Sequence, residues 1–108
     1  MPTSVSSGTL PSVIGTEHEL MNETTNDFFF GHISLKNMAS GDTVEIRKYI
    51  IIAGGLEDQI LETFVDAQTE ADSTYKYFAP EASTASYRVT LKHTIGTTKN
   101  FAYNFYKV

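Results

Sequence analysis

Three histidines, His18, His32 and His93, are the side chains in this sequence best suited to metal binding or proton transfer. No two of them have the His-x-His or His-x-x-x-His spacing that directs two imidazoles to the same side of a strand or helix. Only His18 has acidic neighbours, Glu17 and Glu19, but adjacent side chains of a strand point to opposite faces. We therefore expect solvated or edge-packed histidines and no protein-bound metal.

Other catalytic patterns are also missing. The sequence has no cysteine, which excludes disulfides, thiolate zinc sites and cysteine nucleophiles. No serine lies in a Gly-x-Ser-x-Gly turn, and the isolated pair Gly54-Gly55 predicts a hairpin rather than a phosphate-binding loop. A carboxylate pair for glycoside cleavage stays open on sequence alone, although the acidic residues are spread as on a solvated surface. We expect neither an enzyme nor a bound cofactor.

Aromatic side chains are the best candidates for binding. The chain has six tyrosines and seven phenylalanines, more than one hydrophobic face needs. A tyrosine ring offers apolar area with a polar tip, so a cluster of them could stack on sugars. The alternative is that they fill the core and subunit contacts, and the absence of tryptophan weakens the sugar hypothesis. The candidates for the platform are Tyr75, Tyr77, Tyr87, Tyr103 and Tyr106.

Length and charge limit the class of protein. A chain of 108 residues is long enough for one domain only. Its net charge of −5 and the lack of a Lys/Arg cluster argue against nucleic-acid binding. Residues 1–15 have no positively charged start followed by an apolar run, so no secretory signal is predicted. No stretch approaches eighteen apolar residues, so we expect no membrane span.

The stretch from Asn37 to Gly55 is the part around which the fold is expected to be organised. After a turn at residues 40–42, apolar residues fall on every second position from Thr43 to Ala53, interrupted by Lys48. This is the two-residue period of a half-buried strand, long enough to cross a small domain. Its apolar face consists of Val44, Ile46, Ile50 and Ile52.

Similar patterns predict six further strands, and hence an all-β, antiparallel β-sandwich of about seven strands over residues 14–108. The segment 56–67 leaves two possibilities open, because its apolar residues fit a helical stripe as well as an alternating strand. The preceding hairpin turn favours the strand. The last two segments predict a hairpin with one solvated face. The expected strands cover residues 14–21, 27–36, 56–67, 75–79, 86–95 and 99–108.

Residues 1–13 are polar and show no period, which predicts an extended arm rather than a strand. Such an arm either frays or docks on a neighbouring subunit through small apolar anchors. Two tyrosines of the 75–79 segment are further candidates for subunit contacts. The residues expected at such contacts are Val5, Leu10, Pro11, Val13, Tyr75 and Tyr77.

The order of these segments resembles that of small virion structural proteins of tailed bacteriophages. The resemblance covers residues 14–108 and rests on two turn-and-strand patterns. One is the corner Met38-Ala39-Ser40-Gly41-Asp42. The other is the final hairpin, with Val89-Thr90-Leu91-Lys92 followed by Thr94, Gly96 and Thr97.

The resemblance implies a β-sandwich subunit on a virus particle, most plausibly a decoration (cement) or minor capsid protein, and it implies no catalytic residue. The partners would be the major capsid protein and copies of the chain itself, in a homo-oligomer for which a trimer is one option. Neither nucleic acid nor a membrane is an expected partner. The protein would be made in the host cytoplasm and located on the capsid surface of the virion. Two alternatives remain open: a receptor- or carbohydrate-binding module of a tail fibre or spike, and a tail or neck component.

Overall fold

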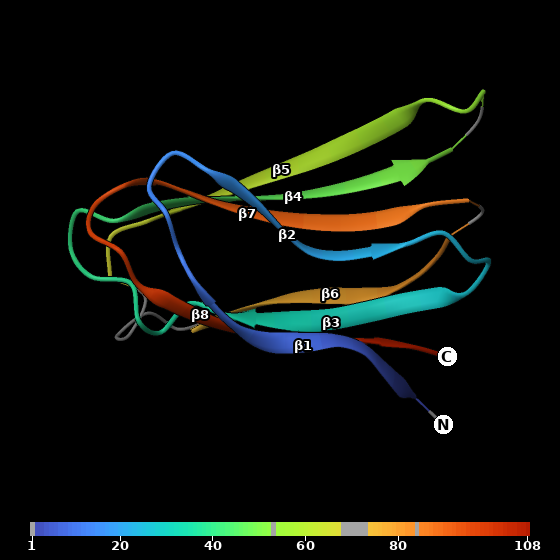
Figure 1. The fold of residues 1–108 in the computed structure, drawn as a ribbon, viewed down its shortest axis with the longest axis horizontal. Helices are drawn as coiled ribbons and strands as arrows, with labels where there is room; N and C mark the ends of the chain where they lie inside the picture. The colour runs from blue at the N-terminus through green and yellow to red at the C-terminus, as the bar shows by residue number, and fades with distance from the viewer. Residues whose placement is uncertain (1, 53, 68–73, 84) are drawn as a thin grey trace.

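A computed structural model describes residues 2–52, 54–67, 74–83 and 85–108 of the chain. These residues form eight strands and no helix. The strands make two four-stranded antiparallel sheets that lie face to face (Figure 1). The prediction of an all-β, antiparallel chain is therefore confirmed, in a sandwich-like arrangement with one strand more than expected.

Each sheet combines strands from distant parts of the chain. The first sheet, here called sheet 1, has the order β1 (Thr3–Pro11), β8 (Asn100–Lys107), β3 (Phe28–Ser34) and β6 (Tyr75–Ala82). The second, sheet 2, has the order β2 (Glu17–Glu23), β7 (Tyr87–Ile95), β4 (Thr43–Ile51) and β5 (Glu57–Val65). The strand predicted from Thr43 matches β4 closely, while Ala53 lies outside the described residues.

The core lies between the sheets and follows from the two-residue period. Alternate residues of the strands point inward, where aromatic rings from sheet 1 meet aliphatic side chains from sheet 2. Met38, in the corner before β4, is also buried. The fully buried core residues include Phe29, Ile33, Val44, Val89, Leu91, Phe101 and Phe105.

The segment 56–67 contains a strand, so the helical alternative is wrong. Gly54 and Gly55 both have positive φ, as a tight hairpin requires, and they turn the chain so that β5 pairs with β4 from Ile51↔Glu57 to Thr43↔Val65. β4 offers hydrogen-bonding partners to the backbone of β5. This pairing determines the structure of the segment, although its apolar side chains also have helical spacing.

The first residues form strand β1 rather than the predicted arm. β1 pairs with β8 along its length, and Val5 and Leu10 pack against the chain's own core. A register shift between Ser4 and Ser6 interrupts the alternation, and the strand is rich in serine, threonine and glycine, so the sequence shows no period. Docking of this segment on another subunit stays a prediction.

The two long sides of the sandwich differ. On one side β1 and β2 lie next to each other and the chain passes from one sheet to the other (Figure 1). On the other side β5 and β6 are the last strands of their sheets. Two ion pairs bridge this open side: the Lys76 ammonium lies 2.7 Å from the Glu62 carboxylate, and Lys48 pairs with Glu81.

Candidate functional site

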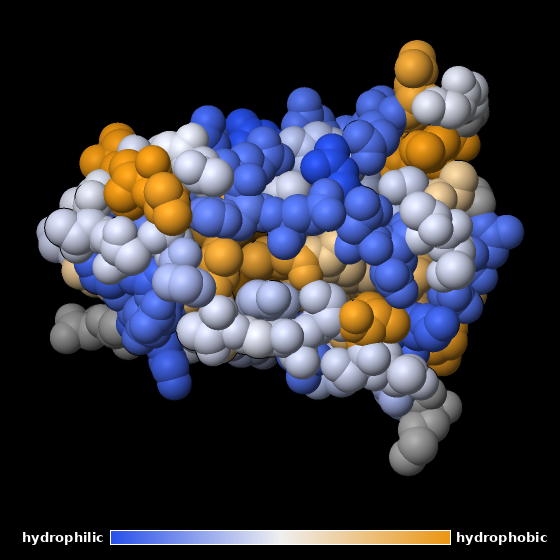
Figure 2. All heavy atoms as spheres, in the orientation of Figure 1, coloured by the Kyte–Doolittle hydropathy of each residue, from blue (hydrophilic) through white to orange (hydrophobic). Residues whose placement is uncertain are grey.

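The outer face of sheet 2 carries charged side chains, whereas the outer face of sheet 1 carries uncharged polar and aromatic side chains. On sheet 2, Arg88 lies 3.0 Å from Glu57 and 3.6 Å from Glu19, and its guanidinium covers the Tyr49 ring at 3.9 Å. Glu17 accepts hydrogen bonds from the Tyr49 hydroxyl at 2.7 Å and from the Thr90 hydroxyl at 2.6 Å. Figure 2 shows this layer as mainly blue spheres, above a paler layer that belongs to sheet 1.

The charged groups of sheet 2 stabilise one another. Burial raises the pKa of Glu17, but the hydrogen bonds from Thr90 and Tyr49 and the nearby arginines outweigh it, so that the pKa lies below its ordinary value. The pKa of Tyr49 is raised by burial and by the Glu17 carboxylate. The hydrogen bond to Glu57 raises the pKa of Arg88. The charged groups of Glu17, Glu57 and Arg88 on this face therefore already have hydrogen-bonding or ion-pair partners within the chain.

Sheet 1 presents an uncharged outer face. Residues that alternate with its buried aromatic rings point outward, and no Asp, Glu, Lys or Arg is among those at the paired positions of the described strands. Hydroxyl, amide, imidazole and aromatic groups cover this surface instead. They come from Ser4, Ser7, Thr9, Phe30, His32, Ser34, Tyr75, Tyr77, Ala102, Asn104 and Tyr106.

Aromatic rings form a row across this face. Phe30 stacks on Tyr106 with 5.3 Å between ring centroids. His32 stacks on Tyr77 at 5.2 Å and meets Tyr75 edge-on at 5.6 Å. Because cross-strand pairing places His32 opposite Tyr77 and Phe30 opposite Tyr106, the row continues from β6 over β3 to β8.

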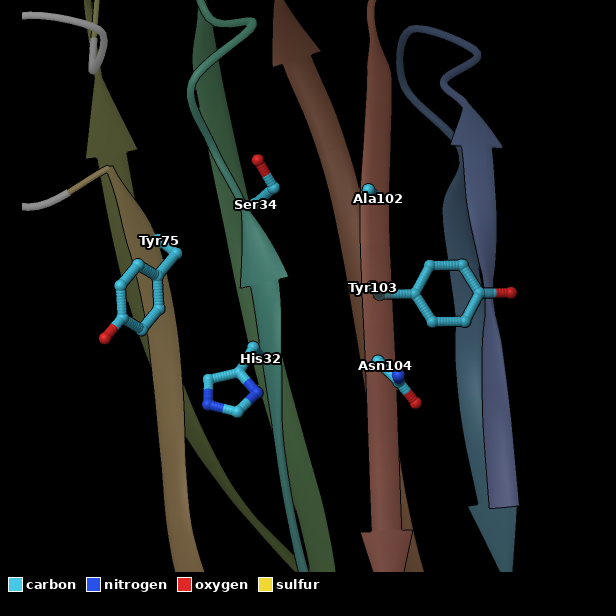
Figure 3. Close-up of a pocket in the computed structure, with 6 residues that line it drawn as sticks. All are labelled: His32, Ser34, Tyr75, Ala102, Tyr103 and Asn104. Carbon is cyan, nitrogen blue, oxygen red and sulfur yellow. The ribbon is translucent and has the colours of Figure 1, made fainter. Parts of the chain in front are cut away.

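The tyrosine platform predicted from the sequence is only partly present. Tyr87 is fully buried, stacks on Phe29 at 5.2 Å, and has its pKa raised by burial. Tyr103 is half-buried against the core and turns its ring toward β1 (Figure 3). Tyr87 lies in the other sheet and is buried, so including it in the platform was wrong, whereas Tyr103 lines the edge of the outer face although its ring follows the inward phase of β8. Tyr75, Tyr77 and Tyr106 share the outer face of sheet 1.

The six predicted contact residues do not form one surface. Val5 and Leu10 face the core of their own chain. Pro11 is exposed at the end of β1, and Val13 is 55% exposed in the connection to β2. Only Tyr75 and Tyr77 lie together, on β6. A role of these residues in subunit contacts stays a prediction.

An apolar edge that the sequence analysis missed lies on the β4–β5 hairpin. Leu56 and Ile60 are 76% and 62% exposed, and Ile52 and Leu61 are exposed beside them. We call these four residues the β5 edge; β5 is the last strand of sheet 2. Figure 2 shows orange spheres at the end of this hairpin. The sequence signal was the set of apolar residues at helical spacing, because a strand cannot point all of them inward.

His93 is fully buried, which contradicts the expectation of solvated or edge-packed histidines. Its Nδ1 lies 2.8 Å from the Ser12 hydroxyl and its Nε2 lies 3.3 Å from Asp42 Oδ1. These are the residue types of a serine hydrolase, but Ser12 and Asp42 are also buried, each 2% exposed, so a substrate cannot reach the hydroxyl. The cluster connects the end of β1, the corner before β4 and the end of β7.

Within the described ranges no three or more histidine, aspartate or glutamate side chains gather as a metal site would require. The same part of the chain contains no helix long and apolar enough to span a membrane. No protein-family model, curated protein or solved structure matches the chain.

Proposed function

We propose that the chain is a virion structural protein of a tailed bacteriophage, a capsid decoration or minor capsid subunit that binds the major capsid protein and copies of itself. The observation that carries this proposal is the β5 edge. Four large apolar side chains are exposed on one hairpin, and a concentration of this kind is typical of surfaces that bind another protein. The phage-like corner at residues 38–42 and the hairpin of β7 and β8 add support.

The geometry of β5 suits attachment by strand addition. The outer edge of a last strand offers backbone donors and acceptors, and apolar side chains on both of its faces can be buried by the same partner. Glu62 points inward and pairs with Lys76, which disfavours indiscriminate pairing of this edge. A modest contact of this size is sufficient on a shell, because many copies bind a repeated surface at once.

The proposal is tested by co-sedimentation with capsids of the parent virus from which the chain has been removed. A double variant, Leu56→Ser with Ile60→Ser, should reduce occupancy at least tenfold, because both side chains are exposed and would lose their contact with the shell. The matched control is Ile95→Ser, which removes a similarly exposed apolar side chain, 60% exposed, at the end of β7 and outside both the β5 edge and the predicted contact residues. Full occupancy by the double variant, with a normal fold, would refute attachment through the β5 edge.

Two other functions make different predictions for the same protein. A tail or neck component would use the β5 edge in a ring or tube, and a cryo-EM map of the intact particle would locate it there. A carbohydrate-binding module of a tail fibre or spike is favoured by one observation, the uncharged aromatic face of sheet 1 around Tyr75, Tyr77 and His32.

A further inference from the structure

A shallow hollow lies within the aromatic face of sheet 1. Its volume is about 240 Å³, and it spans three neighbouring strands, β6, β3 and β8. Figure 3 shows the Tyr75 and His32 rings on one side and Ala102 and Asn104, both on β8, on the other, with Ser34 above His32 on β3. The hollow is lined by His32, Ser34, Tyr75, Ala102, Tyr103 and Asn104.

The polar groups of the hollow are hydroxyl, phenol, amide and imidazole groups, all of which can form hydrogen bonds. The Ser4 hydroxyl donates to Asn104 Oδ1 at 3.1 Å, which orients the amide and leaves its Nδ2 as a donor. The Ser34 hydroxyl and the Tyr75 phenol can both donate and accept. None of the lining residues is a lysine or arginine, so the hollow lacks the groups that bind phosphate or sulfate tightly.

Ring and amide groups in this arrangement match the chemistry of a sugar. One face of a pyranose ring presents C–H groups that pack on an aromatic ring, while its hydroxyls need donors and acceptors at the rim. Tyr75 is 54% exposed, so its ring is available for such packing. The charged residues of the other outer face lie on sheet 2, across the core, where they cannot contribute to this site.

We propose that the outer face of sheet 1 binds a neutral saccharide, with Tyr75 as the stacking ring and Asn104 and Ser34 as hydrogen-bonding groups. This site is on the opposite sheet from the β5 edge and does not depend on attachment to a shell. It deepens the carbohydrate-binding alternative by assigning the residues and the class of glycan. A shell protein with this site could hold a particle on a glycan-coated surface.

The test begins with a glycan array that carries neutral oligomers of glucose, mannose, galactose and N-acetylglucosamine beside sialylated and sulfated oligosaccharides. The best neutral binder is then titrated into isotope-labelled protein and followed by NMR. We expect shifts of the Ser34, Ala102 and Asn104 amides. Tyr75→Ala should weaken binding at least tenfold, whereas Tyr75→Phe, which keeps the ring, should weaken it about threefold or less.

Phe28→Ala is the matched control, because Phe28 is also 54% exposed and lies at the opposite end of β3 from the hollow. It should leave the affinity unchanged. Four results would overturn the proposal: a flat array, binding of charged glycans only, an equal loss in Tyr75→Ala and Phe28→Ala, or amide shifts that arise from self-association on concentration without sugar. Any of these leaves the capsid test of the β5 edge unaffected.

Discussion

Replacing Asp42 by asparagine should destabilise the fold more than any other isosteric change of an acidic residue described above. Asp42 Oδ2 accepts a hydrogen bond from the Ala39 amide at 2.8 Å and lies 3.4 Å from the Lys99 ammonium. Oδ1 accepts from the Thr97 amide at 3.3 Å and faces His93 Nε2. An asparagine has the same shape, but one of these two positions would carry an NH₂ group that faces another donor.

The magnitude follows from these contacts. Losing a hydrogen bond to a charged group costs about 1.5 to 3 kcal/mol, and leaving a buried donor unsatisfied costs about 1 to 3 kcal/mol. The two terms overlap, so we expect Asp42→Asn to lower the free energy of unfolding by roughly 3 kcal/mol. This is a large part of the roughly 5 to 15 kcal/mol that stabilises a typical domain. The melting temperature should fall by roughly 10 to 20 °C.

The same substitution should change the pH dependence of stability. Burial raises the pKa of Asp42, but the hydrogen bonds from Ala39, Lys99 and Thr97 outweigh it and hold the pKa below that of an unfolded aspartate. A lowered pKa in the folded state means that the stabilisation is complete above about pH 4 and is lost as the pH falls further. The difference between wild type and Asp42→Asn should therefore shrink in acid.

Urea unfolding at several pH values, followed by circular dichroism, measures both effects. Asp58→Asn, an exposed change on β5, is the control and should alter the free energy of unfolding by no more than about 0.5 kcal/mol. A cost below about 1 kcal/mol for Asp42→Asn, or a wild-type pH dependence in that variant, would refute the view that this carboxylate organises the corner.

Three further changes test the packing. Gly31→Ala should cost about 3 kcal/mol in urea unfolding, because a Cβ there would lie 2.6 Å from the Asn104 carbonyl oxygen and overlap Phe105; a cost near zero would contradict the β3–β8 contact. Tyr87→Phe should stabilise the protein or leave it unchanged, within about 1 kcal/mol, because the buried hydroxyl has no hydrogen-bond partner among the described residues; a clear loss would show that it has one. Deleting residues 1–12 should unfold or aggregate the protein, seen as lost NMR dispersion, because it removes β1 and uncovers the edge of β8; a well-folded product would contradict the role of β1 in sheet 1.

The strands with clean alternation were predictable from the sequence. β4, β7 and β8 place an apolar or aromatic residue on nearly every second position, with Lys48 as the exception in β4, and the burial of Val44, Val89 and Phe105 follows that phase. β1 was not predictable in this way. Its bulge shifts the phase midway, and its serines and threonines contribute through the ladder with β8 rather than through apolar burial.

The buried polar cluster was beyond local sequence patterns for a different reason. Ser12, Asp42 and His93 are far apart in the sequence, and they meet only because β1, the corner before β4 and β7 converge at one end of the sandwich. The inward phase of Tyr87, Val89 and Leu91 already pointed His93 to the core. The alternation could not show that Ser12 and Asp42 would supply the polar partners that a buried imidazole needs.

The residues that make up the aromatic face could not be predicted from the sequence for the same reason. The alternation of a strand puts Phe30 and His32 on one side of β3, but which tyrosines join them depends on the registers of β3 with β6 and with β8. Those registers bring Tyr77 and Asn104 opposite His32 and leave Tyr87 in the other sheet. Composition therefore indicates a chain rich in aromatic side chains, whereas only the pairing of strands shows which of them share the outer face of sheet 1.

The ion pairs of the described residues are distributed unevenly over the molecule, and this distribution bears on both proposed surfaces. Most ion pairs of the described residues lie on the outer face of sheet 2 or bridge the open side, so the carboxylates there are held by arginines and lysines of the same chain. Groups already paired must lose those contacts before they bind anything else, which makes that face a poor place for recognition. The four apolar side chains of the β5 edge and the uncharged lining of the hollow on sheet 1 take no part in these ion pairs, although Glu57 and Glu62 elsewhere on β5 do. The binding that we propose at each surface would therefore depend on shape and apolar contact rather than on charge.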